Sequence, residues 1–276
     1  MDKTMPSPAE RISALRRELD CATQALYRQF GGYQAPVVPL DACVACCMNA
    51  DLEREMRRLP LRSLTARHFY EYNDAAKSTV QPADEIKYLA PRMLELLAQG
   101  AQLHHSTELY LDRLGRCGPG AFSPQESAAL QRFALAFFAL GLEQWHEPRA
   151  SVFQGEEAFS CLLMWDYAGV PLDALLAHWM ACGSESATLH FVDACFYEFL
   201  WGGHCISNAF ATHRGGYRAT MEQWLGLPAT RRHWAERLMQ LADRGPASTW
   251  LPAGMGDHPR YALDERIGSV FDAMAA

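Results

Sequence analysis

Apolar residues recur three and four positions apart along most of this chain, which is the spacing of one face of an α-helix. The clearest case is an expected helix over residues 9–30. Its apolar stripe consists of Ile12, Leu15, Leu19, Ala22 and Leu26. Hairpin signals such as Asn-Gly or Asp-Gly between alternating runs are absent from the sequence, and β-branched residues are sparse. The sequence therefore predicts an all-α fold, a globular array of about ten helices.

Capping residues and glycines divide the chain into these helices. Asn49 is expected to cap a helix that continues to Leu59, and Ser123 to Glu126 form a capping box for a helix reaching about Trp145. Other helices are expected over 65–72, 82–97, 101–114, 156–167, 172–182, 187–201, 217–225, 230–244 and 263–274. The Gly- and Pro-containing segment 115–120 predicts a boundary between a subdomain over 1–117 and an aromatic-rich subdomain over 118–276.

Composition indicates a folded protein that works outside the membrane. No apolar run reaches the roughly 18 residues that a spanning helix needs. The segment 1–6 lacks the apolar stretch of a secretory signal, and the nine cysteines are an odd number, as expected for reduced thiols rather than a disulfide scaffold. We therefore expect a cytoplasmic protein.

The net charge of −7 is concentrated in the middle of the chain. Residues 81–200 carry 6 basic and 15 acidic residues, whereas the segments before and after them are each at +1. An acidic surface attracts basic partners and repels nucleic acid. The alternative is a solvated acidic face that only aids solubility.

Cys43, Cys46 and Cys47 are weak candidates for a metal site. Two thiolates at CxxC spacing can chelate zinc, but a structural zinc site needs four ligands, and no second CxxC is present in the sequence. A redox CxxC normally lies in a βαβ setting, which is not predicted here. We therefore expect these cysteines to serve packing, and we expect no cofactor.

His190, Asp193 and Tyr197 fall on one face of a very apolar predicted helix, with Glu198 beside them. Such a stripe is typical of a polar network in a helical core, and it would also suit an active site with perturbed pKa values. Nucleophile-elbow, HExxH and phosphate-loop patterns are absent from the sequence. The stripe is the first place to look for catalysis, although we expect none.

The segments Cys43-Val-Ala-Cys-Cys, Leu61-Arg-Ser-Leu-Thr and Asp84 to Leu97 resemble a group of bacterial all-helical proteins with an early cysteine cluster. The likeness covers roughly residues 40–115. It implies an immunity protein of a bacterial toxin system, similar to those of type VI secretion, that binds and blocks one toxin, such as a nuclease. The resemblance assigns no functional residues.

These observations together predict a non-catalytic binding protein that neutralises a basic toxin through an acidic surface. The alternatives are a helical enzyme or metal protein that uses the stripe or the cysteines, and a structural adaptor. Acidic residues and two aromatic anchors should form the contact surface, on and beside an exposed loop from Glu147 through Arg149 to Gly155. They are Glu143, Glu147, Glu156, Glu157, Asp166, Asp173, Trp145 and Phe153.

Overall fold

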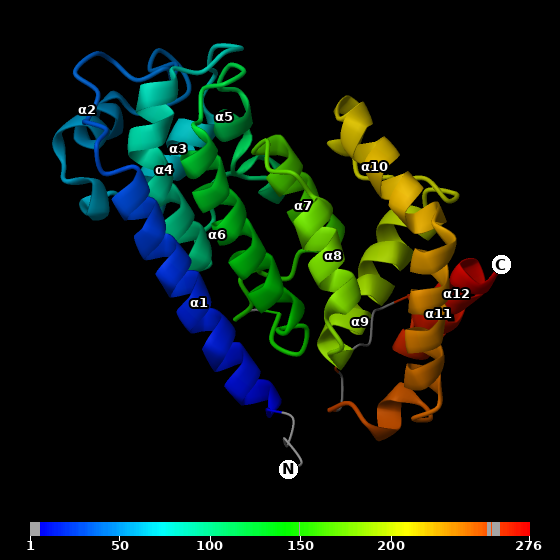
Figure 1. Ribbon diagram of the computed structural model, residues 1–276. Helices are drawn as coiled ribbons and strands as arrows, with labels where there is room; N and C mark the ends of the chain where they lie inside the picture. The colour runs from blue at the N-terminus through cyan, green and yellow to red at the C-terminus, as the bar shows by residue number, and fades with distance from the viewer. Residues whose placement is uncertain (1–5, 149, 253–254, 256–259) are drawn as a thin grey trace.

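The computed structural model describes residues 6–148, 150–252, 255 and 260–276, and in these residues the protein is all-helical, as predicted (Figure 1). Twelve α-helices occur there, and the only β-type pairing is an isolated bridge between Gln81 and Cys117. The helices are α1 (Pro8–Gln29), α2 (Ala50–Arg58), α3 (Ala66–Asp74), α4 (Ala83–Ala98), α5 (Asp112–Gly115), α6 (Pro124–Leu142), α7 (Ala158–Tyr167), α8 (Asp173–Ala181), α9 (Glu185–Ala194), α10 (Gly215–Gly226), α11 (Pro228–Ala242) and α12 (Leu263–Ala275).

Side-chain caps fix the helix starts that the sequence predicts. The Ser123 hydroxyl accepts a hydrogen bond from the Glu126 N–H at 3.2 Å, and the Glu126 carboxylate accepts one from the Ser123 N–H at 2.7 Å. The Asn49 side chain accepts from the first N–H groups of α2. These bonds satisfy amide groups that have no partner inside a helix, which is why the boundaries were predictable locally.

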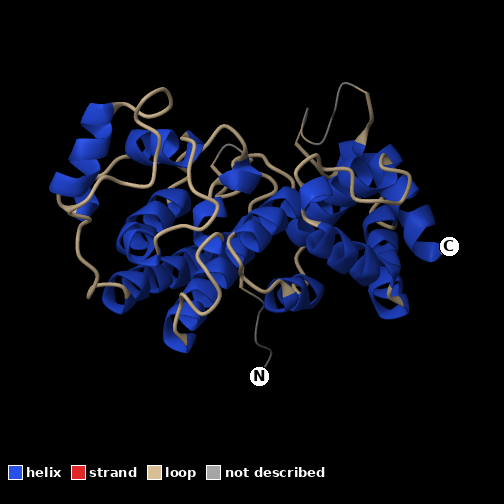
Figure 2. Cartoon of the chain, turned by 90° about the horizontal axis from the view of Figure 1, so that it is seen from above, coloured by secondary structure: helices blue, strands red, loops and turns tan. Residues whose placement is uncertain are grey.

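Helices α1 and α6 pack along each other and run in opposite directions (Figure 1). Two ion pairs define this antiparallel register: Arg11 near the start of α1 pairs with Glu143 at the end of α6, and Glu18 pairs with Arg132 near the middle of both helices. From α1 and α6 the helices continue across the molecule to α10, α11 and α12, and loops connect them throughout (Figure 2). Helices from both sides of segment 115–120 are thus packed against each other, and the two-subdomain division remains a prediction.

The expected helix over 101–114 is wrong. Only the 3₁₀ turn Thr107–Leu109 and the single turn of α5 form there. The buried Asn73 amide on α3 donates hydrogen bonds to the carbonyls of Leu103 and Tyr110, and the His104 ring accepts from the Ser106 N–H. These side-chain bonds offer the backbone an alternative to the helical ladder.

The expected helix over 187–201 is interrupted. Regular α-helix ends at Ala194, and Cys195–Leu200 form a π-helical turn that carries Tyr197 and Glu198. Wide turns of this kind are frequent at functional sites because they redirect side chains. This turn borders the pocket described below.

The core of the C-terminal half is built from aromatic rings, as its composition suggests. Trp179 contacts Phe138, Phe159 and Trp234 edge to face, and Phe191 stacks on Trp234 with centroids 3.9 Å apart. Edge-to-face and stacked pairs of this kind fix relative helix positions more sharply than aliphatic contacts do. In the described residues, none of the helices has the length and apolarity to cross a lipid bilayer.

Candidate binding pocket

A pocket of about 400 Å³ lies between the loop that joins α6 to α7, helix α9 and the first part of α12. We call it the acidic pocket. Its walls combine aromatic, acidic and small polar residues from segments more than 100 residues apart in sequence. They are Gln144, Trp145, Pro148, Ser151, Phe153, Gly155, Glu156, Glu157, His190, Asp193, Tyr197, Met255 and Arg266.

Gln144 and Phe153 hold the α6–α7 loop in place. The Gln144 side chain accepts a hydrogen bond from the Val152 N–H at 3.1 Å. The Phe153 ring lies on the α6 backbone at Gly141, where a Cβ atom would come within 2.1 Å of the ring. A glycine is therefore required at position 141 for the loop to pack this closely.

The chain enters α7 through two left-handed residues that precede the acidic pair. Gln154 has φ 57° and Gly155 has φ 87°. Gly155 adopts this conformation without strain, whereas Gln154 is held in it by the anchored loop around it. The turn delivers Glu156 and Glu157, the N-cap residue of α7, into the pocket wall.

His190 is buried below the same loop. Its Nε2 lies 3.0 Å from the Gly141 carbonyl oxygen, so Nε2 carries the proton and donates. Burial lowers the pKa of His190 to about 3. A neutral imidazole with this pKa is a poor general base at neutral pH, and the residue acts mainly as a link between α9 and α6.

Asp193 and Trp145 form the second anchor of the pocket. The indole N–H of Trp145 donates to the Asp193 carboxylate at 2.7 Å, and the Trp145 backbone N–H donates to Ser186 at 2.9 Å. Arg266 of α12 forms an ion pair with the same carboxylate. The ring of Trp145 is thus fixed at the mouth of the pocket, with part of its surface exposed.

Glu156 and Glu157 differ from Asp193 because no Lys or Arg among the described residues forms an ion pair with them. Burial and the neighbouring Glu108 raise the pKa of Glu156, and burial together with Glu156 raises that of Glu157. Both side chains remain partly exposed. The pocket therefore holds two adjacent carboxyl groups whose charge is uncompensated when they ionise.

A further carboxyl group, Glu198, lies behind the pocket wall on the π-helical turn. Glu198 is 7 % exposed, and its carboxylate accepts a hydrogen bond from the Ser160 hydroxyl at 3.1 Å. Its other oxygen has no hydrogen-bond partner among the described residues. Burial and Glu157 raise the pKa of Glu198 to about 8. The Glu198 carboxyl is therefore protonated and neutral below this pKa and carries a negative charge above it.

The structure brings together two groups of residues that the sequence kept apart. The predicted contact residues Trp145, Phe153, Glu156 and Glu157 line the same pocket as the stripe of His190, Asp193 and Tyr197. Local patterns did not single out Gln144, Met255 or Arg266, because they join the pocket only through tertiary packing.

The other predicted contact residues lie elsewhere. Glu143 is buried and paired with Arg11, so its placement on a contact surface is wrong. Asp166 is paired with Arg214 on a different part of the surface. Glu147 and Asp173 are exposed and do not line the pocket.

The α6–α7 loop is also less exposed than expected. Glu147 and Gly155 are exposed, but Ser151, Val152 and Phe153 are buried. Phe153 therefore serves as a core anchor instead of an exposed contact. Arg149 lies outside the described residues.

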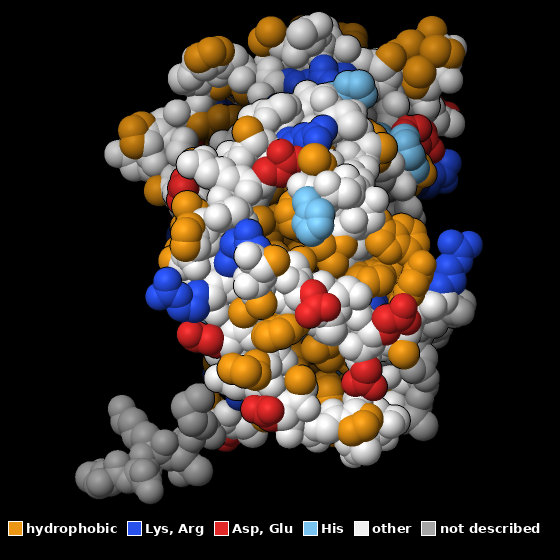
Figure 3. All heavy atoms as spheres, turned by 90° about the vertical axis from the view of Figure 1, so that its right-hand side faces the viewer, with side chains coloured by type: hydrophobic (Ala, Val, Ile, Leu, Met, Phe, Trp, Pro, Cys, Tyr) orange, Lys and Arg blue, Asp and Glu red, His pale blue; other side chains and the backbone are white. Residues whose placement is uncertain are grey.

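A second groove, of about 400 Å³, lies between α11 and α12 and is mainly apolar. Met239 and Phe271 contribute to it, and Asp264 is the one charged residue in its lining. The face that α10 to α12 turn outward also shows hydrophobic side chains over its middle, with single acidic side chains between them (Figure 3). This groove lacks the convergent polar groups that define a specific ligand.

The cysteine cluster lies far from the pocket, in the loop before α2. Cys46 and Cys47 are exposed and Cys43 is partly exposed, so the expectation that they serve packing is wrong. Backbone hydrogen bonds from Cys46 and Ala45 lower the pKa of the Cys43 thiol, and the neighbouring thiols raise that of Cys46 to about 11. By contrast, Cys161 and Cys195 are buried in apolar helices.

No protein-family model, no curated protein and no solved structure matches this chain. The kinship suggested by residues 40–115 therefore stays a prediction.

Proposed function

We propose that this chain is a non-catalytic binding protein that takes a positively charged group of a partner into the acidic pocket. The observation that carries the proposal is the pair Glu156 and Glu157, which line a pocket without a basic partner among the described residues. A bound guanidinium or ammonium group would supply the missing positive charge. It would also lower the raised pKa values of both carboxyl groups.

The aromatic walls favour the same ligand class. Trp145 and Tyr197 line the pocket beside the two glutamates, and Trp145 is locked by its bond to Asp193. A cation within about 6 Å of an aromatic ring face gains about 0.5–2 kcal/mol. A fixed ring also loses little entropy on binding, so it is a good anchor.

The contacts of the His190 stripe argue for binding over catalysis. The Nε2 proton of His190 is engaged by Gly141, and Asp193 is engaged by both Trp145 and Arg266. These groups hold the pocket walls together. General acid–base catalysis needs a group with a pKa near the working pH and within reach of the substrate, and His190 does not meet the first condition.

We propose further that the partner is a basic protein that inserts a Lys or Arg side chain, as an inhibited toxin would. Its interface would include the exposed Glu147 on the same loop. Charge complementarity of this kind raises association rates and selects against acidic partners. An immunity role in a bacterial toxin system is the setting that the sequence resemblance suggests.

Affinity capture of the tagged full-length chain from its own cells at moderate salt, followed by mass spectrometry, tests this function. We expect one stoichiometric basic protein. Its affinity, measured after purification, should fall at least about 10-fold for Glu156→Gln/Glu157→Gln, since two charge-assisted contacts are lost. Glu147→Gln is the matched control and should change mainly the association rate.

Two outcomes would contradict the proposal. Recovery of the tagged chain without any bound protein would contradict the existence of such a partner. Unchanged affinity of the double variant at low salt would show that the acidic pocket is not the contact.

A further inference from the structure

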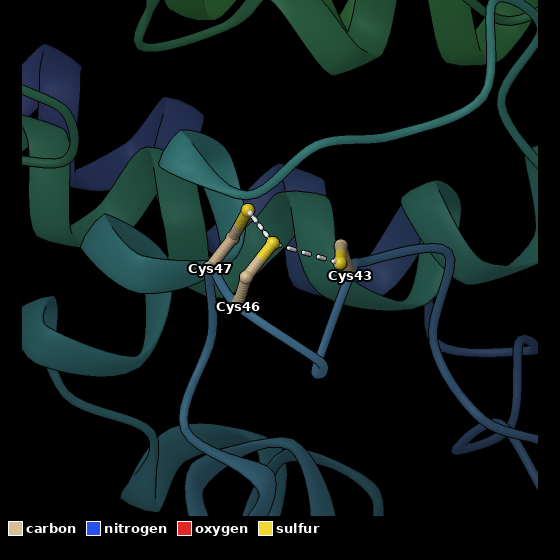
Figure 4. Close-up of side chains that lie close together, drawn as sticks. All are labelled: Cys43, Cys46 and Cys47. Atoms are coloured by element: carbon tan, nitrogen blue, oxygen red, sulfur yellow. Dashed lines mark hydrogen bonds between the residues drawn. The ribbon is translucent and has the colours of Figure 1, made fainter.

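The three sulfur atoms of the cysteine cluster lie together in one tight loop (Figure 4). The Cys46 sulfur lies between the other two, 3.5 Å from that of Cys43 and 3.3 Å from that of Cys47. All three sulfurs are within 4.8 Å of one another. This arrangement is independent of the acidic pocket and plays no part in the function proposed above.

The loop is held in place from both sides. The Cys43 N–H donates to the Ala76 carbonyl, and the Met48 N–H donates to the Cys43 carbonyl, each at 2.9 Å. Directly after the loop, the Asn49 N–H donates to the Glu71 carboxylate at 2.8 Å. Met48 is buried and anchors the end of the loop in the core. The sulfurs are thus presented at the surface by a pre-ordered backbone.

Before the loop, Asp41 makes a second set of bonds. Its N–H donates to Glu85, and its carboxylate accepts from the Ser78 N–H and from the Gln81 amide. Arg113, which is 1 % exposed, donates to the Asp41 carbonyl at 2.8 Å. Buried polar networks of this extent hold a segment in one conformation.

The sulfur spacing fits a shared metal ion. Three thiolates at about 2.3 Å from one ion in a trigonal arrangement have sulfurs about 4 Å apart. The observed separations of 3.3 and 3.5 Å and the outer limit of 4.8 Å lie on either side of that value. Small side-chain rotations in the exposed loop therefore bring all three sulfurs to bonding distance.

We propose that Cys43, Cys46 and Cys47 bind one copper(I) ion through their three sulfur atoms. Soft thiolate ligands select copper(I), zinc and iron–sulfur clusters. A structural zinc site needs four ligands, and catalytic zinc sites with three protein ligands include a histidine. In the part of the chain that the structure describes, no histidine or carboxylate joins this group of sulfurs. Copper(I) is satisfied by three sulfurs, and each thiol that binds it releases its proton.

The other group of candidate ligands, Asp74, His104 and His105, is less suited to a metal. His104 accepts from the Ser106 N–H through Nδ1 at 3.1 Å, and its Nε2 faces the Asp74 carboxylate at 3.3 Å. Both ring nitrogens of His104 are therefore already engaged. Among the described residues, the hydrogen bonds of the thiols in the cysteine loop to side chains are to one another.

Anaerobic titration of the reduced full-length protein with copper(I), in competition with the chromogenic chelator bicinchoninate, tests the proposal. We expect one tightly bound equivalent and a sulfur-only coordination shell by X-ray absorption. Cys46→Ser removes the central sulfur and should weaken binding at least about 100-fold, more than loss of an outer-shell group does. Cys21→Ser changes an exposed cysteine outside the loop and should have no effect.

Circular dichroism would check that the variants keep their helices, which is expected because the changes are at the surface. Copper(I) binding that survives the triple change Cys43→Ser/Cys46→Ser/Cys47→Ser would overturn the assignment. Displacement of copper(I) by equimolar zinc would overturn the choice of metal.

Discussion

The acidic residues in the middle of the chain belong to two populations with opposite roles. Several that face the packed helices are matched by a cation: Glu126 pairs with Lys87, Asp112 with Lys77, and Glu143 with Arg11. Glu156 and Glu157 line a pocket and have no such partner among the described residues. Part of the negative charge of residues 81–200 is thus balanced by ion pairs within the fold, whereas the charge of the pocket pair is not.

Buried carboxylates with a paired cation stabilise the fold, whereas the pocket pair is proposed to bind a ligand. Breaking a buried pair leaves one charge unsolvated. Removing one of two carboxylates that repel each other relieves that repulsion. Such a change should weaken ligand binding instead of the fold. Substitutions in the two populations should therefore change stability in opposite directions.

The largest effect is expected at the buried pair of Glu126 and Lys87, whose charged atoms are 3.1 Å apart. Glu126→Gln keeps a capping side chain for α6 but leaves Lys87 without its counter-ion. We expect a loss of about 3 kcal/mol in the free energy of unfolding, measured with urea. Glu18→Gln is the control, because it breaks an ion pair that is half exposed on both sides and should cost less than about 1 kcal/mol. Equal losses at the two sites would contradict the distinction by burial.

The next effect concerns the glycine on which the pocket loop rests. Gly141→Ala places a methyl group in the space of the Phe153 ring and should lower stability by about 1–3 kcal/mol. Gly268→Ala lies in the middle of α12 with no atom within 4 Å of the new methyl group. The control should be stabilised by about 0.5–1 kcal/mol, since alanine favours a helix. A neutral Gly141→Ala would mean that the loop is not packed as described.

A pH-dependent effect is expected at Glu198, whose pKa is raised to about 8. A carboxyl group with a raised pKa holds its proton more tightly in the folded chain, so stability falls as the pH rises from about 4.5 to about 8. Glu198→Gln removes this contribution. The variant should match the natural chain at pH 5 and exceed it by about 1–2 kcal/mol at pH 8 to 9. The stability of both proteins would be measured by thermal unfolding across this pH range. An equal pH dependence in the two proteins would contradict the assignment.

The smallest change in stability should come from the pocket pair. Glu156→Gln/Glu157→Gln is expected to leave the free energy of unfolding unchanged or raise it by less than about 1 kcal/mol. Unfolding this double variant in urea, in parallel with Glu126→Gln, compares the two groups of carboxylates directly. A large destabilisation by the double change would assign both residues to the fold instead of to a ligand.

Much of the fold follows from local sequence, and the exceptions have identifiable causes. The caps at Asn49 and Ser123 were predictable because each acts within three residues of its own position. The segment 101–111 was not, because Asn73 acts on it from about 30 residues away. The π-helical turn at Cys195–Leu200 leaves no signature in the spacing of apolar residues.

The candidate site was foreseen only in parts. The polarity of Glu156 and Glu157 and the stripe at His190 were visible separately in the sequence. Their meeting depends on the contact between the Gly141 carbonyl and His190, across 49 residues. The burial of Glu143 depends on Arg11, across 132 residues, and no local pattern reports it.

The most direct test of the central claim is a calorimetric titration with agmatine, a small guanidinium and ammonium probe, at pH 5 and pH 8. Because the pKa values of Glu156 and Glu157 are raised, the pocket gains negative charge over this range. We predict that the natural chain and Glu147→Gln bind the probe several-fold more tightly at pH 8 than at pH 5, and that Glu156→Gln/Glu157→Gln loses most of the binding. A double variant that binds agmatine as tightly as the natural chain does at both pH values would contradict the account.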